Sequence, residues 1–138
     1  MLLCQRIMSV HDNRKLAAAV DRERSSWLTY APYLDFFRAE LRRARSVPPA
    51  EVPGDVITMN SRFAVTDPRT GQAICYTLAY PDASAPERGR LSVLSPMGMA
   101  LYGARVGDEV CWTSPAGPEV ARVARLLYQP EAAGNFDE

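Results

Sequence analysis

Ser92-Val-Leu-Ser-Pro-Met-Gly-Met-Ala-Leu-Tyr-Gly-Ala-Arg-Val-Gly-Asp108 is the stretch from which the fold of this chain is interpreted. Ser95 is suited to cap a helix, because its hydroxyl accepts a backbone N–H of the first turn, and Pro96 is suited to the first helical position. An apolar face and a terminating glycine follow: Met97, Ala100, Leu101 and Gly103. The stretch therefore predicts a short helix that begins at Pro96.

Strand patterns surround this predicted helix. Apolar residues alternate in a way that predicts strands over residues 56–66, 74–80, 91–94, 109–113 and 120–128. Tight-turn sequences separate some of them, as in Asp67-Pro-Arg-Thr-Gly71 and Pro115-Ala-Gly-Pro118. This part of the chain therefore predicts a mostly antiparallel sheet with one helix on it, and the fold class is α+β.

The preceding residues, 12–46, have helical periodicity. Asp12 or Asn13 can cap a first helix, on which Leu16 and Val20 lie one turn apart. Proline is tolerated in a first helical turn, so residues 29–32 predict a turn that begins a second helix. Apolar residues then recur at spacings of three and four: Leu34, Phe37, Leu41 and Ala44. We expect a short antiparallel helical hairpin with arms of about 15 residues, or roughly 22 Å.

A proline-rich segment separates the two parts. Residues 46–54 contain three prolines and a glycine, which predicts a semi-rigid linker. The charge changes sign here, because residues 1–48 hold nine Lys/Arg against five Asp/Glu and residues 49–138 hold seven against eleven. We place the domain boundary at this point, with residues 1–47 as the N-terminal segment and hairpin and residues 48–138 as the C-terminal domain.

Basic and aromatic residues concentrate on the predicted hairpin. The arginines Arg38, Arg42, Arg43 and Arg45 could attract nucleic acid or an acidic protein, but a solvated helix face explains them equally well. Direct nucleic-acid binding by the chain alone is therefore not expected. Aromatic residues gather near the tip: Trp27, Tyr30, Tyr33, Phe36 and Phe37. Packing of the tip explains this group, and so does an exposed patch for a partner, of which Trp27, Tyr30 and Tyr33 are the candidates.

The residue types that catalysis and metal binding require are scarce. His11 is the only histidine, and the three cysteines, Cys4, Cys75 and Cys111, form no CxxC pair. The glycines Gly98, Gly103 and Gly107 match neither nucleotide fingerprint, and close packing, a helix stop and a turn explain them. We expect no metal, no cofactor, no small-molecule substrate and no enzymatic activity. Reduced thiols and the lack of an 18-residue apolar run indicate a cytoplasmic protein without a membrane segment.

The motif around Ser95 resembles the C-terminal domain of the bacterial transcript-cleavage factors of the Gre type, with their Ser-Pro, Ala-Leu, Gly and Gly-Asp landmarks. Two more stretches, Pro53-Gly-Asp-Val-Ile-Thr-Met-Asn-Ser61 and Tyr128-Gln-Pro-Glu-Ala-Ala-Gly-Asn-Phe136, are similar to the regulator of nucleoside diphosphate kinase (Rnk) family, a Gre-related group. The resemblance covers about residues 48–136 and includes the hairpin only in outline.

This resemblance implies an FKBP-like C-terminal domain, a short N-terminal coiled coil, and binding to RNA polymerase at the rim of its secondary channel. In Gre factors the loop before the domain's helix contacts the polymerase. The matching positions here are Ser95 and Pro96, with Met97 beside them. Gre factors tend to have an acidic residue just before this Ser-Pro pair, where this chain has Leu94.

Gre factors also have an acidic pair at the tip of a long coiled coil, which reaches the polymerase's catalytic Mg²⁺. Here Asp35 is the only carboxylate between Arg24 and Phe37, and the predicted arms are shorter. The resemblance thus implies a regulator that competes with longer-armed factors without cleaving transcripts. Two alternatives stay open. One is a true cleavage factor, and the other is an FKBP-like peptidyl-prolyl isomerase with a pocket drawn from Tyr76, Tyr80, Tyr102 and Trp112.

Overall fold

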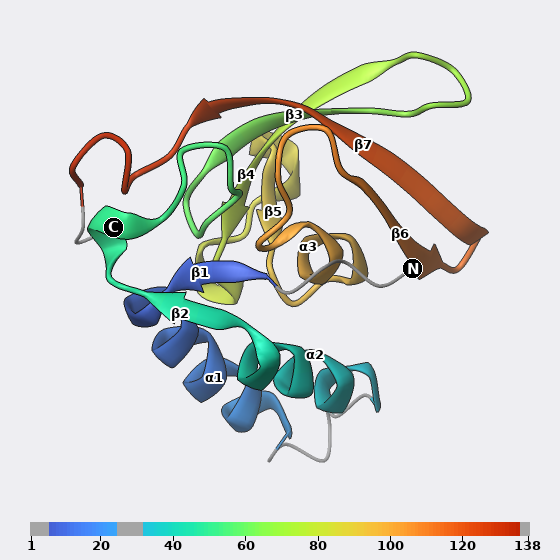
Figure 1. Ribbon diagram of the computed structural model, residues 1–138. Helices are drawn as coiled ribbons and strands as arrows, with labels where there is room; N and C mark the ends of the chain where they lie inside the picture. The colour runs from blue at the N-terminus through green and yellow to red at the C-terminus, as the bar shows by residue number, and fades with distance from the viewer. Residues whose placement is uncertain (1–5, 25–31, 136–138) are drawn as a thin grey trace.

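A curled sheet and a pair of helices form most of the computed structural model, which describes residues 6–24 and 32–135 (Figure 1). The sheet has the strand order β5-β4-β3-β7-β6. Its strands are β3 (Arg62–Thr66), β4 (Ala73–Ala79), β5 (Arg90–Ser92), β6 (Glu109–Ser114) and β7 (Gly117–Tyr128). Within this sheet only the β4–β5 pairing is parallel, so the predicted α+β class with a mostly antiparallel sheet is confirmed.

The helix α3 (Pro96–Leu101) lies beneath the sheet (Figure 1). It begins at Pro96, as predicted. Gly98 packs so closely on the preceding strand that a Cβ atom at this position would lie 2.0 Å from the carbonyl oxygen of Ser92. The close-packing role predicted for Gly98 is confirmed. The loop before β5 contains two short 3₁₀ helices, η2 (Pro81–Ala83) and η3 (Pro86–Arg88).

The strand predicted over residues 56–66 is shorter than expected. Val56 forms only an isolated bridge with Arg105, and β3 begins at Arg62. Between them the chain turns, because the Ser61 hydroxyl accepts the Thr58 N–H at 2.9 Å and Asn60 adopts a left-handed backbone, φ 64°. The alternation of apolar residues here reflects side chains buried by a turn, so this part of the prediction was wrong.

The helices α1 (Val10–Arg24) and α2 (Pro32–Arg43) pack against each other. Asn13 near the start of α1 donates to the carbonyl oxygen of Leu41 near the end of α2, at 3.1 Å. Asp21 pairs with Arg38 at 3.2 Å. The expected apolar positions are buried: Leu16, Val20, Leu34, Phe37 and Leu41. No helix in the described ranges is both long and apolar enough to span a membrane.

The cap of α1 differs from the prediction. The Ser9 hydroxyl accepts the Asp12 N–H at 2.9 Å, so Ser9 is the capping residue. Asp12 and Asn13 were wrong as caps, because they lie inside the first turn and their side chains contact other elements. Asn13 donates to Leu41 and to the Ser46 hydroxyl.

A short parallel ladder, absent from the prediction, joins the ends of the helical pair. Strand β1 (Ile7–Ser9) precedes α1 and strand β2 (Arg45–Val47) follows α2, with Met8 opposite Ser46. The 3₁₀ helix η1 (Pro49–Glu51) comes next. The predicted linker over residues 46–54 therefore starts as a strand that is hydrogen-bonded to the N-terminal part of the chain.

The helical pair and the sheet share one hydrophobic core. The ring of Phe37 on α2 meets the ring of Tyr102 edge to face, with centroids 6.5 Å apart. The buried Asp12 carboxylate accepts the Met59 N–H at 3.2 Å and the Tyr80 hydroxyl at 3.5 Å. Burial and, as the smaller cause, the negative charge of Glu131 together raise the pKa of Asp12 to about 7.

Replacing Gly98 by alanine should strongly destabilise the fold. The added methyl group would overlap a backbone oxygen of β5, which no side-chain rotation can relieve. We expect the free energy of unfolding in urea to fall by about 3 kcal/mol or more. The matched control is Gly54→Ala, where nothing lies within 4 Å of the new Cβ, and a change within about 0.5 kcal/mol is expected. Equal stability of the two variants would contradict the packing described.

Asp12 should make the stability depend on pH. Its folded-state pKa is raised above the ordinary value, so the folded protein holds the proton more tightly than the unfolded chain. The resulting stabilisation is complete below about pH 4 and is lost as the pH rises to about 7. Asp12→Asn keeps an oxygen acceptor for Met59 without ionising. As the pH rises between these limits, the free energy of unfolding of Asp12→Asn should therefore increase by on the order of 4 kcal/mol relative to that of the wild type.

Denaturation curves at a series of pH values measure this difference. Glu131→Gln is the accompanying variant, because removing that charge should lower the pKa of Asp12 and move the transition to lower pH. Curves for the wild type and Asp12→Asn that stay parallel over the whole pH range would refute the assignment.

Candidate functional site

The predicted docking edge lies where β5 passes into α3. Ser95 has an extended backbone, and its hydroxyl accepts the Gly98 N–H at 3.0 Å and donates to the Ser92 carbonyl oxygen at 2.6 Å. Both hydrogen-bonding roles of this hydroxyl are thus used within the protein. Pro96 is exposed, so a partner at this edge would meet the proline ring first.

Met97 and Leu94, on either side of this pair, are only partly exposed. Met97 lines a hollow of about 160 Å³ together with Tyr76 and Trp112. Leu94 packs against the hydrophobic core. The position at which Gre factors tend to have an acidic residue is thus an apolar contact in this chain, and the surface beside Pro96 is less charged as a result.

The predicted aromatic candidates lie at the edge of what the structure describes. Trp27 and Tyr30 fall outside the described residues, and Tyr33 belongs to α2 without a described side chain. The next two aromatic residues have opposite environments. Phe37 is 2% exposed and belongs to the core, whereas Phe36 is 59% exposed.

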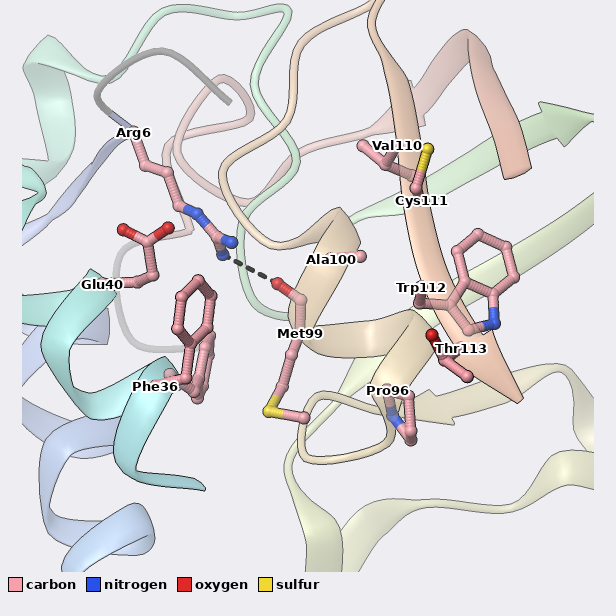
Figure 2. Close-up of a pocket in the computed structure, with 11 residues that line it drawn as sticks. Arg6, Phe36, Glu40, Pro96, Met99, Ala100, Val110, Cys111, Trp112 and Thr113 are labelled. Carbon is pink, nitrogen blue, oxygen red and sulfur yellow. Dashed lines mark hydrogen bonds between the residues drawn. The ribbon is translucent and has the colours of Figure 1, made fainter. Parts of the chain in front are cut away.

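Phe36 borders an apolar groove of about 350 Å³ between α2, α3 and β6 (Figure 2). Helix α2 supplies Phe36 and Phe37, α3 supplies Pro96 and Met99, and β6 supplies residues 110–113. Pro96 therefore belongs both to the docking edge and to the lining of this groove. The sequence predicted Pro96, noted Phe36 and named Trp112 for a different pocket. It missed Met99 and the rest of the β6 wall, since these residues meet only in the folded chain.

One end of the groove is polar. Arg6 donates through Nη1 to the carbonyl oxygen of Met99 at 2.7 Å (Figure 2). The same Nη1 donates to the carbonyl oxygen of Tyr102 at 2.9 Å. Its guanidinium lies 5.8 Å from the centre of the Phe37 ring. Burial lowers the pKa of Arg6, and the nearby carboxylate of Glu40 opposes this shift. Glu40 in turn accepts from Arg43 at 2.9 Å.

This polar end connects the groove to the N-terminal part of the described chain. Arg6 joins the segment before β1 to the backbone of α3, so it fixes the distance between the helical pair and α3. The remaining lining is mainly apolar, which suits the side chains of a protein partner better than a charged small molecule.

The four aromatic residues proposed for an isomerase pocket do not meet in one pocket, and only Tyr76 and Trp112 share the small hollow beside Met97. Tyr80 lies beneath the Lys15 ammonium, which is 4.5 Å from its ring centre, and Tyr102 is fully buried. Tyr76 packs on Phe63 with ring centroids 6.3 Å apart. Of the four, only Trp112 lines the groove. The predicted pocket is therefore not formed by these residues.

Comparisons with known proteins agree on one family. The family described as "Transcription elongation factor, GreA/GreB, C-term" matches residues 52–128. The "Regulator of nucleoside diphosphate kinase" of Escherichia coli strain K12 is 43% identical over 106 residues, covering 76% of this chain and 78% of that protein. The "Transcription elongation factor GreA" of Solidesulfovibrio magneticus is 32% identical over 104 residues, which are 75% of this chain and 63% of that protein.

A solved structure is similar over most of the chain. It is described as a prokaryotic transcription elongation factor GreA/GreB from Nitrosomonas europaea. Its TM-score is 0.76 at 31% sequence identity, with 91% of this chain and all of that chain covered. The landmarks around Ser95 and the fold agree, and the chain belongs to the regulator of nucleoside diphosphate kinase family, which shares the C-terminal domain of the GreA/GreB transcription elongation factors.

Proposed function

We propose that this protein is a transcription regulator that binds RNA polymerase near the rim of the secondary channel through its C-terminal domain. It competes there with longer-armed Gre-type factors and does not cleave transcripts. The observation that carries this proposal is the position of Pro96. It is exposed at the edge that matches the polymerase-contacting loop of Gre factors, and it borders an apolar groove.

The groove supports a protein partner at this edge. Phe36 and Pro96 are exposed apolar residues on its two sides, and Met99 lines it between them. Large apolar side chains that a partner can cover supply most of the binding energy in protein interfaces. We propose Pro96, with Ser95 as its structural support and Met97 beside it, as the main contact, and Trp27, Tyr30 and Tyr33 as a second contact.

The helices support the absence of cleavage. Helix α1 has 15 residues and α2 has 12, so the arms are about 22 and 18 Å long. Cleavage by Gre factors depends on an acidic pair at the tip, and in this sequence Asp35 is the only carboxylate between Arg24 and Phe37. One carboxylate is a poor ligand set for Mg²⁺. We therefore favour occupancy of the polymerase over catalysis.

The finer description of the fold belongs to the same proposal. We propose that α1 and α2 form a shortened coiled-coil hairpin over residues 1–47, and that residues 48–138 form an FKBP-like domain. The protein would act in the cytoplasm, where its polymerase partner is found, without enzymatic activity and without a cofactor. A true cleavage factor would need an acidic pair at the tip, and the tip sequence has one carboxylate, Asp35. A prolyl isomerase would need an aromatic pocket, and of the four candidate residues only Trp112 lines the groove.

Pro96→Ala should weaken binding to core RNA polymerase by roughly tenfold, because a rigid apolar contact at the centre of the edge is removed. Binding is measured by titrating labelled protein with polymerase. The matched control is Pro86→Ala, since Pro86 is also an exposed proline in the first position of a short helix, η3, away from the groove. An unchanged affinity of the Pro96 variant would remove this contact from the proposal.

In stalled elongation complexes the protein alone should leave transcripts intact. Together with a GreA-type factor, it should reduce the rate of transcript shortening as its concentration rises. The Pro96→Ala variant should need a roughly tenfold higher concentration for the same reduction. Shortened transcripts with this protein alone would identify a true cleavage factor and refute the proposal.

A further inference from the structure

A row of polar side chains crosses the outer face of the sheet. Arg90 on β5 lies opposite Thr77 on β4, Thr77 lies opposite Arg62 on β3, and Arg62 lies opposite Tyr128 on β7. The next residue on β3, Phe63, is fully buried. Because successive side chains of a strand point to opposite faces, Arg62 and its neighbours in the row face away from the core.

These residues surround a hollow. Together with Asn60 they line a depression of about 470 Å³, and no carboxylate is among its lining residues. Arg90 is oriented by a hydrogen bond from Nε to the Ala83 carbonyl oxygen, at 2.9 Å. Tyr128 accepts a hydrogen bond from Asn135 at 2.8 Å, which fixes its ring at the edge of the hollow.

The arginines of this row differ from several others on the surface. Arg38, Arg43, Arg69 and Arg105 each lie within 4 Å of a carboxylate. Among the residues that the structure describes, neither Arg62 nor Arg90 has such an ion pair. One strand, β4, lies between them, so their backbones are two strand spacings, or roughly 10 Å, apart. Two uncompensated guanidinium groups at this spacing attract an anion.

The positive charge continues along β7. Arg125 lies opposite Ala64 and Arg122 lies opposite Thr66, and both arginines are exposed. Alternation along β3 places Arg62, Ala64 and Thr66 on the same face. The outer face therefore has a line of arginines across and along the sheet, although the net charge of the whole chain is zero.

We propose that this outer face binds single-stranded nucleic acid, with phosphates at Arg62 and Arg90 and an unpaired base against the Tyr128 ring. A guanidinium matches the geometry of phosphate oxygens and binds them through two hydrogen bonds. Sheet surfaces that combine basic residues with aromatic rings bind single strands by stacking and charge together, and the Tyr128 ring is half-buried at the edge of the hollow. A Thr hydroxyl and an Asn amide at the same hollow add polar contacts for sugar or base. An acidic protein surface would use the arginines but not the ring.

The test is fluorescence anisotropy of labelled 12-residue oligo(U) and oligo(dT) with the full chain at low salt. The variant Arg62→Ala/Arg90→Ala should bind at least tenfold more weakly, and its salt dependence should be lower by about 1.4, for two lost phosphate contacts. The matched control is Arg69→Ala/Arg105→Ala, which removes the same charge from two exposed arginines that are already paired. This control should bind within about twofold of the wild type.

Two further variants separate the contacts. Arg62→Lys/Arg90→Lys keeps the charge but loses the planar fork, so it should recover part of the affinity. Tyr128→Leu should weaken binding by about fivefold or more through lost stacking, with little change in salt dependence.

Three outcomes would overturn the inference. One is no binding of either oligonucleotide by the wild type. The second is equal weakening by the control pair, since attraction would then follow net charge alone. The third is loss of polymerase binding by Arg62→Ala/Arg90→Ala with oligonucleotide binding unchanged, which would assign the face to an acidic protein. None of these results depends on the Pro96 contact.

Discussion

The two hydrogen bonds from Arg6 to the carbonyl oxygens of Met99 and Tyr102 are the contact on which the candidate groove depends. They hold the segment before β1 against α3, and the edge-to-face contact of Phe37 with Tyr102 packs α2 beside it. The spacing of α2 and α3 then leaves the apolar groove along β6. A buried guanidinium is costly to leave unpaired, so these two hydrogen bonds favour one arrangement of helices and sheet, although the Arg6 Nε–H has no hydrogen-bond partner among the described residues.

Local signals in the sequence predicted the elements near the site. The Ser-Pro pair, the apolar face behind it and the turn residues each act within a few positions of one another, so the start of α3 and most strands followed from short-range rules. The ladder of β1 and β2 could not be predicted in this way. Its strands have three residues each and lie far apart in the chain, so no alternation is long enough to detect.

The groove could not be predicted from the sequence either. Helical periodicity placed Phe37 inward correctly, but the exposure of Phe36 beside Met99 depends on how α2 crosses α3. The cap of α1 shows a similar limit. Ser9, Asp12 and Asn13 are all good capping residues, and the choice of Ser9 follows from the tertiary partners of the other two, Met59 for Asp12 and Leu41 for Asn13. The groove lies between α2, α3 and β6, whereas Arg62 and Arg90 lie on β3 and β5. A protein partner at the groove would therefore not exclude a nucleic acid at the two arginines.

The parallel ladder has a consequence for how this family varies. Because β1 and β2 continue the ends of α1 and α2 that lie away from the tip, their ladder fixes the base of the helical pair. Whole turns can be added to or removed from both helices near the tip while Met8 stays opposite Ser46 and Asn13 keeps its contacts. Reach is therefore an independent variable in this architecture: evolution can change how far the arms extend while the ladder at the base and the edge at Pro96 stay unchanged.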